Sequence, residues 1–157
     1  QLYDGFEPQL DIVAKPLKAS KKKRRTNKNA PDYDLRTYLY QMTGVDLTAI
    51  DGLEVLTVQT IISEVGIDMS KWKSVKHFTS WLGLAPENDI SGGKVLRTGT
   101  KKVKSRANLA FRQAAMGASR GQSAMGVFYR RIRARHGPAV ALVATAHKIA
   151  RIFYVML

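Results

Sequence analysis

The sequence predicts an all-α fold: a compact helical domain with a helix-hairpin-helix-like segment, a small β-hairpin in the loop near Ser91, and a basic N-terminal arm. Apolar residues recur three and four positions apart in several segments after residue 33, as on one face of a helix. Glycines or prolines end these segments, and residues 94–97 form the only run suited to a strand. The 157 residues, 45% of them apolar, suffice for one core. We expect a linker and basic arm over residues 1–32 and one helical domain over residues 33–157.

The predicted arm is defined by its charge. Residues 15–31 hold eight lysines and arginines, two prolines and almost no apolar side chains. Such a segment buries too little apolar surface to offset the entropy lost on ordering, so we expect it to be solvated. It is either a tether that keeps the protein in solution or an arm that binds nucleic acid. We favour the second, with phosphate contacts from the central cations Lys22, Lys23, Arg24 and Arg25.

Two helical segments are predicted in the first half of the domain. The first begins after Asp34 and stops at Gly44, and its apolar face consists of Leu35, Tyr38, Leu39 and Met42. The second, over residues 47–66, reads as a short helix, a glycine turn and a longer helix, which is the outline of a helix-hairpin-helix.

The turn of this motif can bind phosphate in other proteins, because free amides at a helix N-terminus attract an anion. In this chain Asp51 and Glu54 place negative charge at that position. We therefore favour a structural role for the turn over phosphate binding.

A third segment follows Ser74, a candidate helix cap, and ends at the Gly-Leu-Ala-Pro run of residues 83–86. Phe78, Trp81 and Leu82 share its apolar face, so we expect these aromatic rings in the core. The alternative for Trp81 is a platform on which a base stacks.

Three helices are predicted at the C-terminal end, over residues 104–119, 123–135 and 138–157, with breaks at Gly121 and at Gly137-Pro138. The middle helix ends in a cluster of arginines. Cations favour a helix C-terminus, but the cluster exceeds that need. We favour phosphate contact over a merely solvated face for three of its members, Arg130, Arg131 and Arg133.

The last of these helices is long and apolar enough to cross a membrane, but it contains His147, Lys148 and Arg151. We predict that it is a buried amphipathic helix and that no membrane is bound. A cationic protein of the membrane surface is the alternative.

Charge is unevenly distributed along the chain. The net charge is +14, and residues 90–157 carry fourteen lysines and arginines but no aspartate or glutamate. Such a polarised positive field is typical of a nucleic-acid-binding surface. Carboxylate acid/base chemistry is excluded in this half. The three histidines lie on different predicted elements without carboxylates at ligand spacing, so we predict no metal site. The absence of cysteine excludes disulfides and thiolate-bound zinc.

The remaining candidate for chemistry is a hydroxyl in a cationic loop. Ser91 is followed by two glycines, which allow close approach of the backbone to a ligand. A serine that attacks a phosphodiester needs cations to hold the non-bridging oxygens and stabilise the transition state. An ordinary turn is the alternative explanation of Ser-Gly-Gly. Cations expected to position the phosphate are Lys94, Arg97, Lys101, Lys102, Lys104 and Arg106, with Arg112 in the next helix.

Several blocks in the same order resemble the C-terminal transposase domain of the insertion sequence 110 family. They are Trp-Leu-Gly-Leu-Ala-Pro at 81–86, Ser-Gly-Gly-Lys at 91–94, and the runs at 106–115, 128–135 and 139–157. The similarity spans about residues 46–157. It implies a DNA transposase, with Ser91 matching the serine that forms a 5′-phosphoserine link to DNA. This match rests on the position of Ser91 after the Gly-Leu-Ala-Pro turn, and Ser119 and Ser123 are the alternatives. The hairpin departs from the family, because Asp51 and Glu54 replace the usual proline and second glycine.

The resemblance also implies partners. Family members combine this domain with a RuvC-like domain that carries an acidic metal-binding tetrad, which is absent from this chain. We therefore expect no cofactor here and a divalent metal, Mg²⁺, on that other domain. We also expect a homo-oligomer when full length, a structured guide RNA as in some members, and a cytoplasmic, nucleoid-associated place of action in a prokaryote. The chain alone should bind DNA without cutting it. The alternative function is a non-catalytic DNA- or RNA-binding module of helix-hairpin-helix type.

Overall fold

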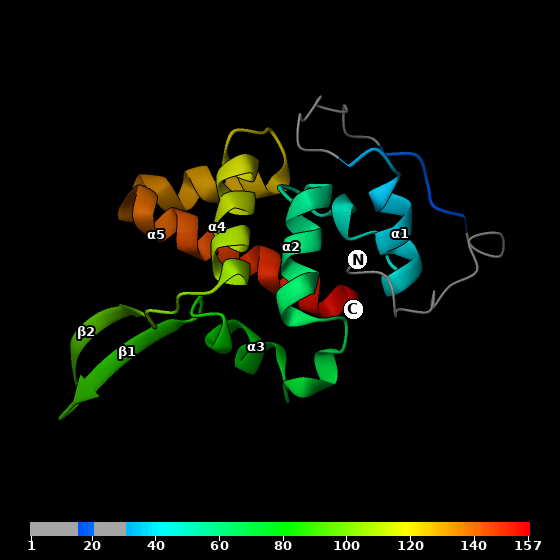
Figure 1. Cartoon of the computed structure of the whole chain (residues 1–157). Coiled ribbons are helices and arrows are strands. Elements are labelled where there is room, and N and C mark those ends of the chain that lie inside the picture. Colours follow the sequence, from blue (N-terminus) through cyan, green and yellow to red (C-terminus); the bar gives the residue numbers. More distant parts are fainter. Residues whose placement is uncertain (1–15, 21–30) are drawn as a thin grey trace.

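The computed structural model describes residues 16–20 and 31–157, and it is mostly helical with one two-stranded antiparallel sheet (Figure 1). This confirms a helical fold with a small hairpin. The division of the chain at residue 32 stays a prediction. The elements in chain order are α1 (Leu35–Thr43), the 3₁₀ helix η1 (Leu47–Ala49), α2 (Val55–Val65), the 3₁₀ helix η2 (Met69–Lys71), α3 (Val75–Trp81), β1 (Pro86–Ser91), β2 (Lys94–Thr100), α4 (Arg106–Ser119) and α5 (Ala124–Met156).

Three phenylalanines form the centre of the core. Phe78 of α3, Phe111 of α4 and Phe153 of α5 have no exposed surface. The ring centroids of Phe111 and Phe153 lie 5.5 Å apart, and Phe78 lies 6.4 Å from each of them. Helix α4 also packs against α2, so these contacts join four helices into one body.

The first helix follows its local signals. The Asp34 carboxylate accepts a hydrogen bond from the Thr37 amide at 3.3 Å, and the helix ends at Gly44 with φ of 73°. Both ends were predicted. The apolar pattern also included Tyr38, but its ring is 47% exposed and meets the Tyr33 ring edge-on outside the core.

Where the sequence predicts a helix-hairpin-helix, the structure has η1, a turn and α2, and the assignment of this motif stays a prediction. Gly52 in the turn has φ of 87°, and a Cβ atom there would lie 2.2 Å from the carbonyl oxygen of Ala114 in α4. Only glycine fits this close approach. The turn is therefore packed against α4, which gives it a structural role of the kind expected from its two acidic neighbours.

Helix α3 departs from the prediction in two ways. Ser74 occupies the N-cap position, but its hydroxyl lies 2.8 Å from Nδ1 of His77 instead of bonding a backbone amide. The core position predicted for Trp81 is wrong, because its side chain is 45% exposed and its ring lies against Trp72 at 5.2 Å. The helix ends at Trp81, and the turn that follows carries Leu82 into the core in its place.

The last two of the three predicted C-terminal helices, over residues 123–135 and 138–157, form one element with a kink, α5. Gly137 has φ of 83° and ψ of 171°, outside the helical region, and Pro138 follows it. The predicted break is therefore present as a change of direction within α5. Among the described residues α5 is the one helix long and apolar enough to cross a membrane, and a third of its most apolar window is buried. Residues of its second half that are buried without exposure are Ala141, Thr145, Ala146, Ile149, Ala150 and Phe153.

The core and surface aromatic rings of α3 should differ in their effect on stability. We expect Phe78→Ala to lower the free energy of unfolding by about 3 to 5 kcal/mol, because it leaves a cavity between three helices. We expect Trp81→Ala to cost about 1 kcal/mol, chiefly the loss of its contact with Trp72. Urea unfolding followed by circular dichroism measures both. Equal losses would contradict the placement of these rings.

Candidate functional site

Ser91 lies at the tip of the β1–β2 hairpin, which extends away from the helices (Figure 1). Gly92 and Gly93 connect the strands with φ of 54° and 75°. Two successive positive φ angles are typical of a type I′ turn, whose twist matches that of a hairpin. The hairpin near Ser91 is thus confirmed, but β1 includes residues that the sequence assigned to a loop. Pro86, Glu87 and Asp89 are poor strand formers, so the pairing with β2 overrides their propensity.

The register places cations on the Ser91 side of the hairpin. Ser91 is paired with Lys94, and Asp89 is paired with Arg97. Leu96 has no partner on β1, so a bulge lies on β2 between these pairs. Because alternate residues of a strand share a face, Asp89 and Ser91 point to one side of β1 with their cross-strand partners. We call this the Ser91 face.

The base of the hairpin is fixed to the helical body. A Cβ atom on Gly83 would lie 2.7 Å from Cγ2 of Val103, so the chains entering and leaving the hairpin touch. The Asn108 side-chain amide, which is buried in α4, donates a 2.7 Å hydrogen bond to the Leu82 carbonyl. The strands from Pro86 to Gly99 are exposed. The hairpin is therefore anchored at its base and accessible at its tip.

Local contacts distinguish Ser91 from Ser119 and Ser123, two other serines within residues 90–157. The Ser119 hydroxyl donates to the Met116 carbonyl at 2.7 Å, and the Ser123 hydroxyl accepts from the Gly126 amide at the start of α5. The Ser91 side chain is exposed and makes no hydrogen bond to any of residues 16–20 or 31–157. Its hydroxyl is available to a ligand.

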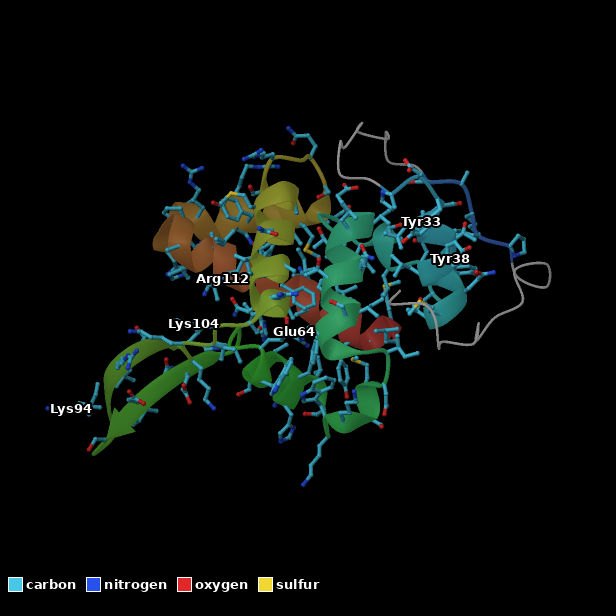
Figure 2. The ribbon with its side chains drawn as sticks, in the orientation of Figure 1. Tyr33, Tyr38, Glu64, Lys94, Lys104 and Arg112 are labelled. Atoms are coloured by element: carbon cyan, nitrogen blue, oxygen red, sulfur yellow. The ribbon has the colours of Figure 1, made fainter. Side chains whose placement is uncertain are left out.

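The predicted cations near Ser91 are spread along the hairpin. Lys94 lies at the tip and Lys104 near the start of α4 (Figure 2). Lys94 and Thr100 are six residues apart on β2, which corresponds to roughly 20 Å. Lys101 pairs with Glu87 at 3.6 Å, so part of its charge is compensated. Beyond Lys94 and Arg97, the structure does not bring the predicted cations to the tip: Lys102, Lys104 and Arg106 are exposed around the base.

The arginines of α4 and α5 lie on the helical body. Arg130 donates to the Gly121 carbonyl at 2.9 Å and to Gln122 Oε1 at 3.3 Å, which ties together the α4–α5 connection. Arg131 lies over the Phe128 ring at 5.8 Å, and Arg133 is exposed. In α4, Nε of Arg112 is buried without a hydrogen-bond partner among the described residues. The predicted contacts of these arginines with phosphate stay predictions, and Lys22, Lys23, Arg24 and Arg25 lie outside the described residues.

The N-terminus of α4 is already occupied by an anion of the protein itself. The Glu64 carboxylate accepts a 2.7 Å hydrogen bond from the Ala107 amide, and the Ser105 hydroxyl accepts one from the Asn108 amide at 3.0 Å. These are the amides that would otherwise attract a phosphate. Sequence analysis missed Glu64, because the contact joins residues 43 positions apart.

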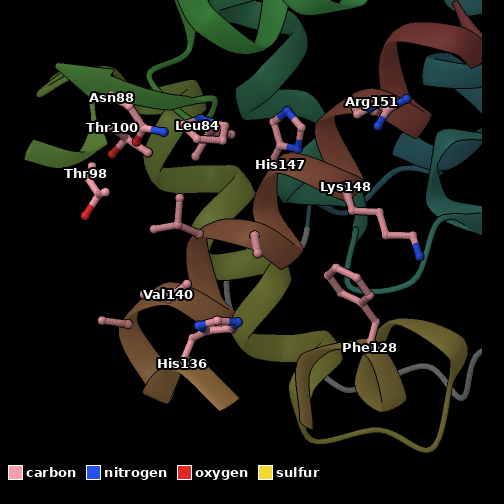
Figure 3. A pocket seen from close by; sticks show the side chains of 15 residues that line it. Leu84, Asn88, Thr98, Thr100, Phe128, His136, Val140, His147, Lys148 and Arg151 are labelled. Carbon is pink, nitrogen blue, oxygen red and sulfur yellow. The ribbon is translucent and has the colours of Figure 1, made fainter. Parts of the chain in front are cut away.

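A groove of about 820 Å³, which we call the α5 groove, lies between the hairpin base and α5 (Figure 3). The groove was not predicted. Burial and the nearby positive charge of Arg151 lower the pKa of His147. Lys148 lies over the Phe128 ring at 4.3 Å. The residues that line the groove are Leu84, Pro86, Asn88, Thr98, Gly99, Thr100, Phe128, His136, Ala139, Val140, Val143, Ala144, His147, Lys148 and Arg151.

Carboxylates are scarce around Ser91. Glu87 is paired with Lys101, and Asp89 lies across from Arg97. In the described ranges, 16–20 and 31–157, no three histidine, aspartate or glutamate side chains gather closely enough to hold a metal ion. The site therefore offers an accessible hydroxyl among cations.

Comparison with protein-family models identifies the family of this chain. The model of the Transposase IS116/IS110/IS902 family matches residues 44–130, more than half of the chain. The chain belongs to this family. The matched residues of this transposase-family chain include the Ser91 hairpin and all of α4. No curated protein matches the chain.

Family membership confirms the resemblance seen in the sequence. A transposase binds DNA and takes part in transposition, so DNA is the partner of this family and the cytoplasm its place of action. The positive charge of residues 90–157 agrees with that partner.

The transposase-family chain should lose stability in mild acid partly through His147. Because the pKa of His147 is lowered in the folded chain, the unfolded chain binds the proton more readily below the ordinary pKa of 6.5. The free energy of unfolding therefore falls as the pH drops through that value. We expect His147→Gln to reduce the fall in melting temperature between about pH 7.5 and about pH 5.5. Val127→Gln, on the same helix, is the control and should keep the wild-type pH dependence.

Proposed function

We propose that this chain supplies the Ser91 hydroxyl as the nucleophile for DNA strand cleavage and rejoining during transposition. The observation that carries the proposal is the position of Ser91. It lies at the exposed tip of a hairpin, paired with Lys94, and its hydroxyl makes no hydrogen bond within the described residues, whereas Ser119 and Ser123 are engaged in helix contacts. Family membership supports the reaction class.

The proposed reaction exchanges one phosphate ester for another. The Ser91 Oγ attacks a backbone phosphorus, an Oγ–P bond forms, and the bond from phosphorus to the 3′ oxygen breaks. The leaving strand ends in a 3′-hydroxyl, whose proton replaces the one lost by serine. A 3′-hydroxyl of another strand then attacks the 5′-phosphoserine and releases Ser91. Because the ester conserves the energy of the broken bond, rejoining requires no nucleotide cofactor.

The cations of the hairpin would act on the phosphate. Lys94 is paired with Ser91 and is the nearest in register, and Arg97 lies on the same face. Their charges would hold the non-bridging oxygens and stabilise the negative charge of the transition state. Cations at the hairpin base, such as Lys102 and Arg106, would hold phosphates further along the strand.

Residues 90–157 contain no carboxylate to accept the Ser91 proton, and their two histidines, His136 and His147, line the α5 groove and not the hairpin tip. The two carboxylates of β1 are matched with cations, and the described residues do not fit a metal site. We therefore propose that an acidic domain elsewhere in the parent protein, or in a second copy, completes the site and carries Mg²⁺. Homo-oligomerisation, a structured guide RNA and association with the nucleoid belong to the same proposal, and the family resemblance supports them.

The test is covalent trapping with the intact parent protein and a nicked DNA substrate from which the cleaved end diffuses away. A protein–DNA adduct should form, and mass spectrometry should map it to Ser91. Ser91→Ala should abolish the adduct and lower recombination about a thousandfold or more, while DNA affinity remains. Ser119→Ala is the matched control and should keep both activities. Recombination that continues in Ser91→Ala would overturn the proposal and favour the non-catalytic DNA- or RNA-binding module.

The 157-residue chain should bind duplex DNA through phosphate contacts. If six to ten cations make such contacts, a log–log plot of affinity against salt should have a slope of roughly −5 to −9. Fluorescence anisotropy over a salt series measures this slope. A value near zero would exclude a phosphate-binding surface of the proposed size.

A further inference from the structure

We propose that the α5 groove binds an unpaired DNA strand beside the cleavage site. The inference rests on the proposed function, because it assigns a second DNA contact to the hairpin that carries Ser91. The groove lies where the base of this hairpin faces α5, and its volume of about 820 Å³ falls within the range of ligand sites (Figure 3).

Both walls of the groove contribute apolar side chains. Leu84 precedes the hairpin, and Val140 and Val143 lie on the second half of α5. Val140 is 51% exposed, so the chain leaves this surface open to solvent. The faces of unpaired bases are the part of DNA that contacts such a surface favourably. In a duplex these faces are stacked inside, so the groove favours a single strand.

The hairpin adds neutral polar groups. Asn88, Thr98 and Thr100 line the groove, and Asn88 is paired with Thr98 across the strands. Their amide and hydroxyl groups both donate and accept hydrogen bonds, as base edges require. A purely apolar partner, such as the face of a packed helix, would leave these groups without partners.

Cations border the groove, and none of the described residues that line it is acidic. Lys148 and Arg151 lie one turn apart on α5, and His136 lies near the kink. The ring of Phe128 holds the Lys148 ammonium 4.3 Å from its centroid. A polyanion complements this border, and a basic or neutral segment of protein does not.

The two faces of the hairpin would contact different strands. Along β1, Asp89 and Ser91 point to one side, and Asn88 points to the other, toward the groove. A strand in the groove is therefore separated by the hairpin from the phosphate at Ser91. The hairpin would keep the two strands apart while one of them is cut.

Binding of labelled oligothymidine, about 12 nucleotides long, to the 157-residue chain tests the inference by fluorescence anisotropy. Val140→Asp places a carboxylate in the groove and should weaken binding about tenfold or more. Val127→Asp changes a valine of the same helix with 54% exposure, outside the groove, and should change binding less than about twofold. Duplex DNA should bind equally to both variants. Circular dichroism confirms that each variant is folded.

A second pair of variants, each of which reverses the charge of one arginine, provides a comparison that does not depend on the first. Arg151→Glu, in the groove, should weaken binding of the single strand more than Arg120→Glu, an exposed residue after α4 with the same change in charge. Equal losses within both pairs would overturn the inference. Failure of oligothymidine to bind, or tight binding of an RNA of equivalent sequence without binding of the DNA, would overturn it as well.

The outcome can be separated from that of the cleavage proposal. Ser91→Ala should leave the affinity for the single strand unchanged, because Ser91 lies outside the groove. A covalent adduct that persists in Ser91→Ala or maps to another residue, with intact groove binding, would contradict only the assignment of the nucleophile. An adduct at Ser91 combined with equal binding by Val140→Asp and Val127→Asp would contradict only the groove.

Discussion

The contact among Phe78, Phe111 and Phe153 is the interaction on which the other features depend. It joins the helix that leads into the hairpin, the helix that follows the hairpin, and the final helix, with all three rings fully buried. Since α3 and α4 flank the hairpin, the position of its base is determined by this packing. The α5 groove depends on the same contact, because one of its walls is the hairpin base and the other is α5.

Residues 90–157, which contain no aspartate or glutamate, form their core from apolar contacts and expose most of their charged side chains. The residues of α4 and α5 that face the core are mainly alanine, with Phe111, Met125, Tyr129, Ile149 and Phe153 as the large side chains. Small side chains allow close approach of helices, so the core needs no buried ion pair, whose desolvation is costly. Most of these cations consequently remain exposed, and within residues 16–20 and 31–157 the carboxylates near them are Glu87, which pairs with Lys101, and Asp89, which lies across from Arg97. The surface of this half therefore carries positive charge that carboxylates of the chain neutralise only in small part.

Local features of the fold could be predicted from the sequence, and long-range contacts could not. The ends of α1 at Asp34 and Gly44 and the kink at Gly137 follow from residues within one turn of each site. The strand-like run at residues 94–97 predicted a hairpin, but β1 forms only through its pairing with that run. Trp81 has the right spacing for a core residue and is exposed, because α3 ends there. The Glu64 contact with α4 and the α5 groove join distant segments, so no local pattern indicates them.

The length of the hairpin turns a small rotation at its base into a large displacement of its tip. Its base is held by Gly83, Val103 and Asn108, whereas its tip lies roughly 20 Å away without support from the helical body. A rotation of about 10° at the base would therefore move Ser91 by about 3.5 Å, far more than the tolerance of about 0.5 Å for a reacting group. An isolated two-stranded hairpin is itself marginally stable. The helical body thus fixes the position of the hairpin base, and contacts with DNA or with another domain must fix the position of its tip.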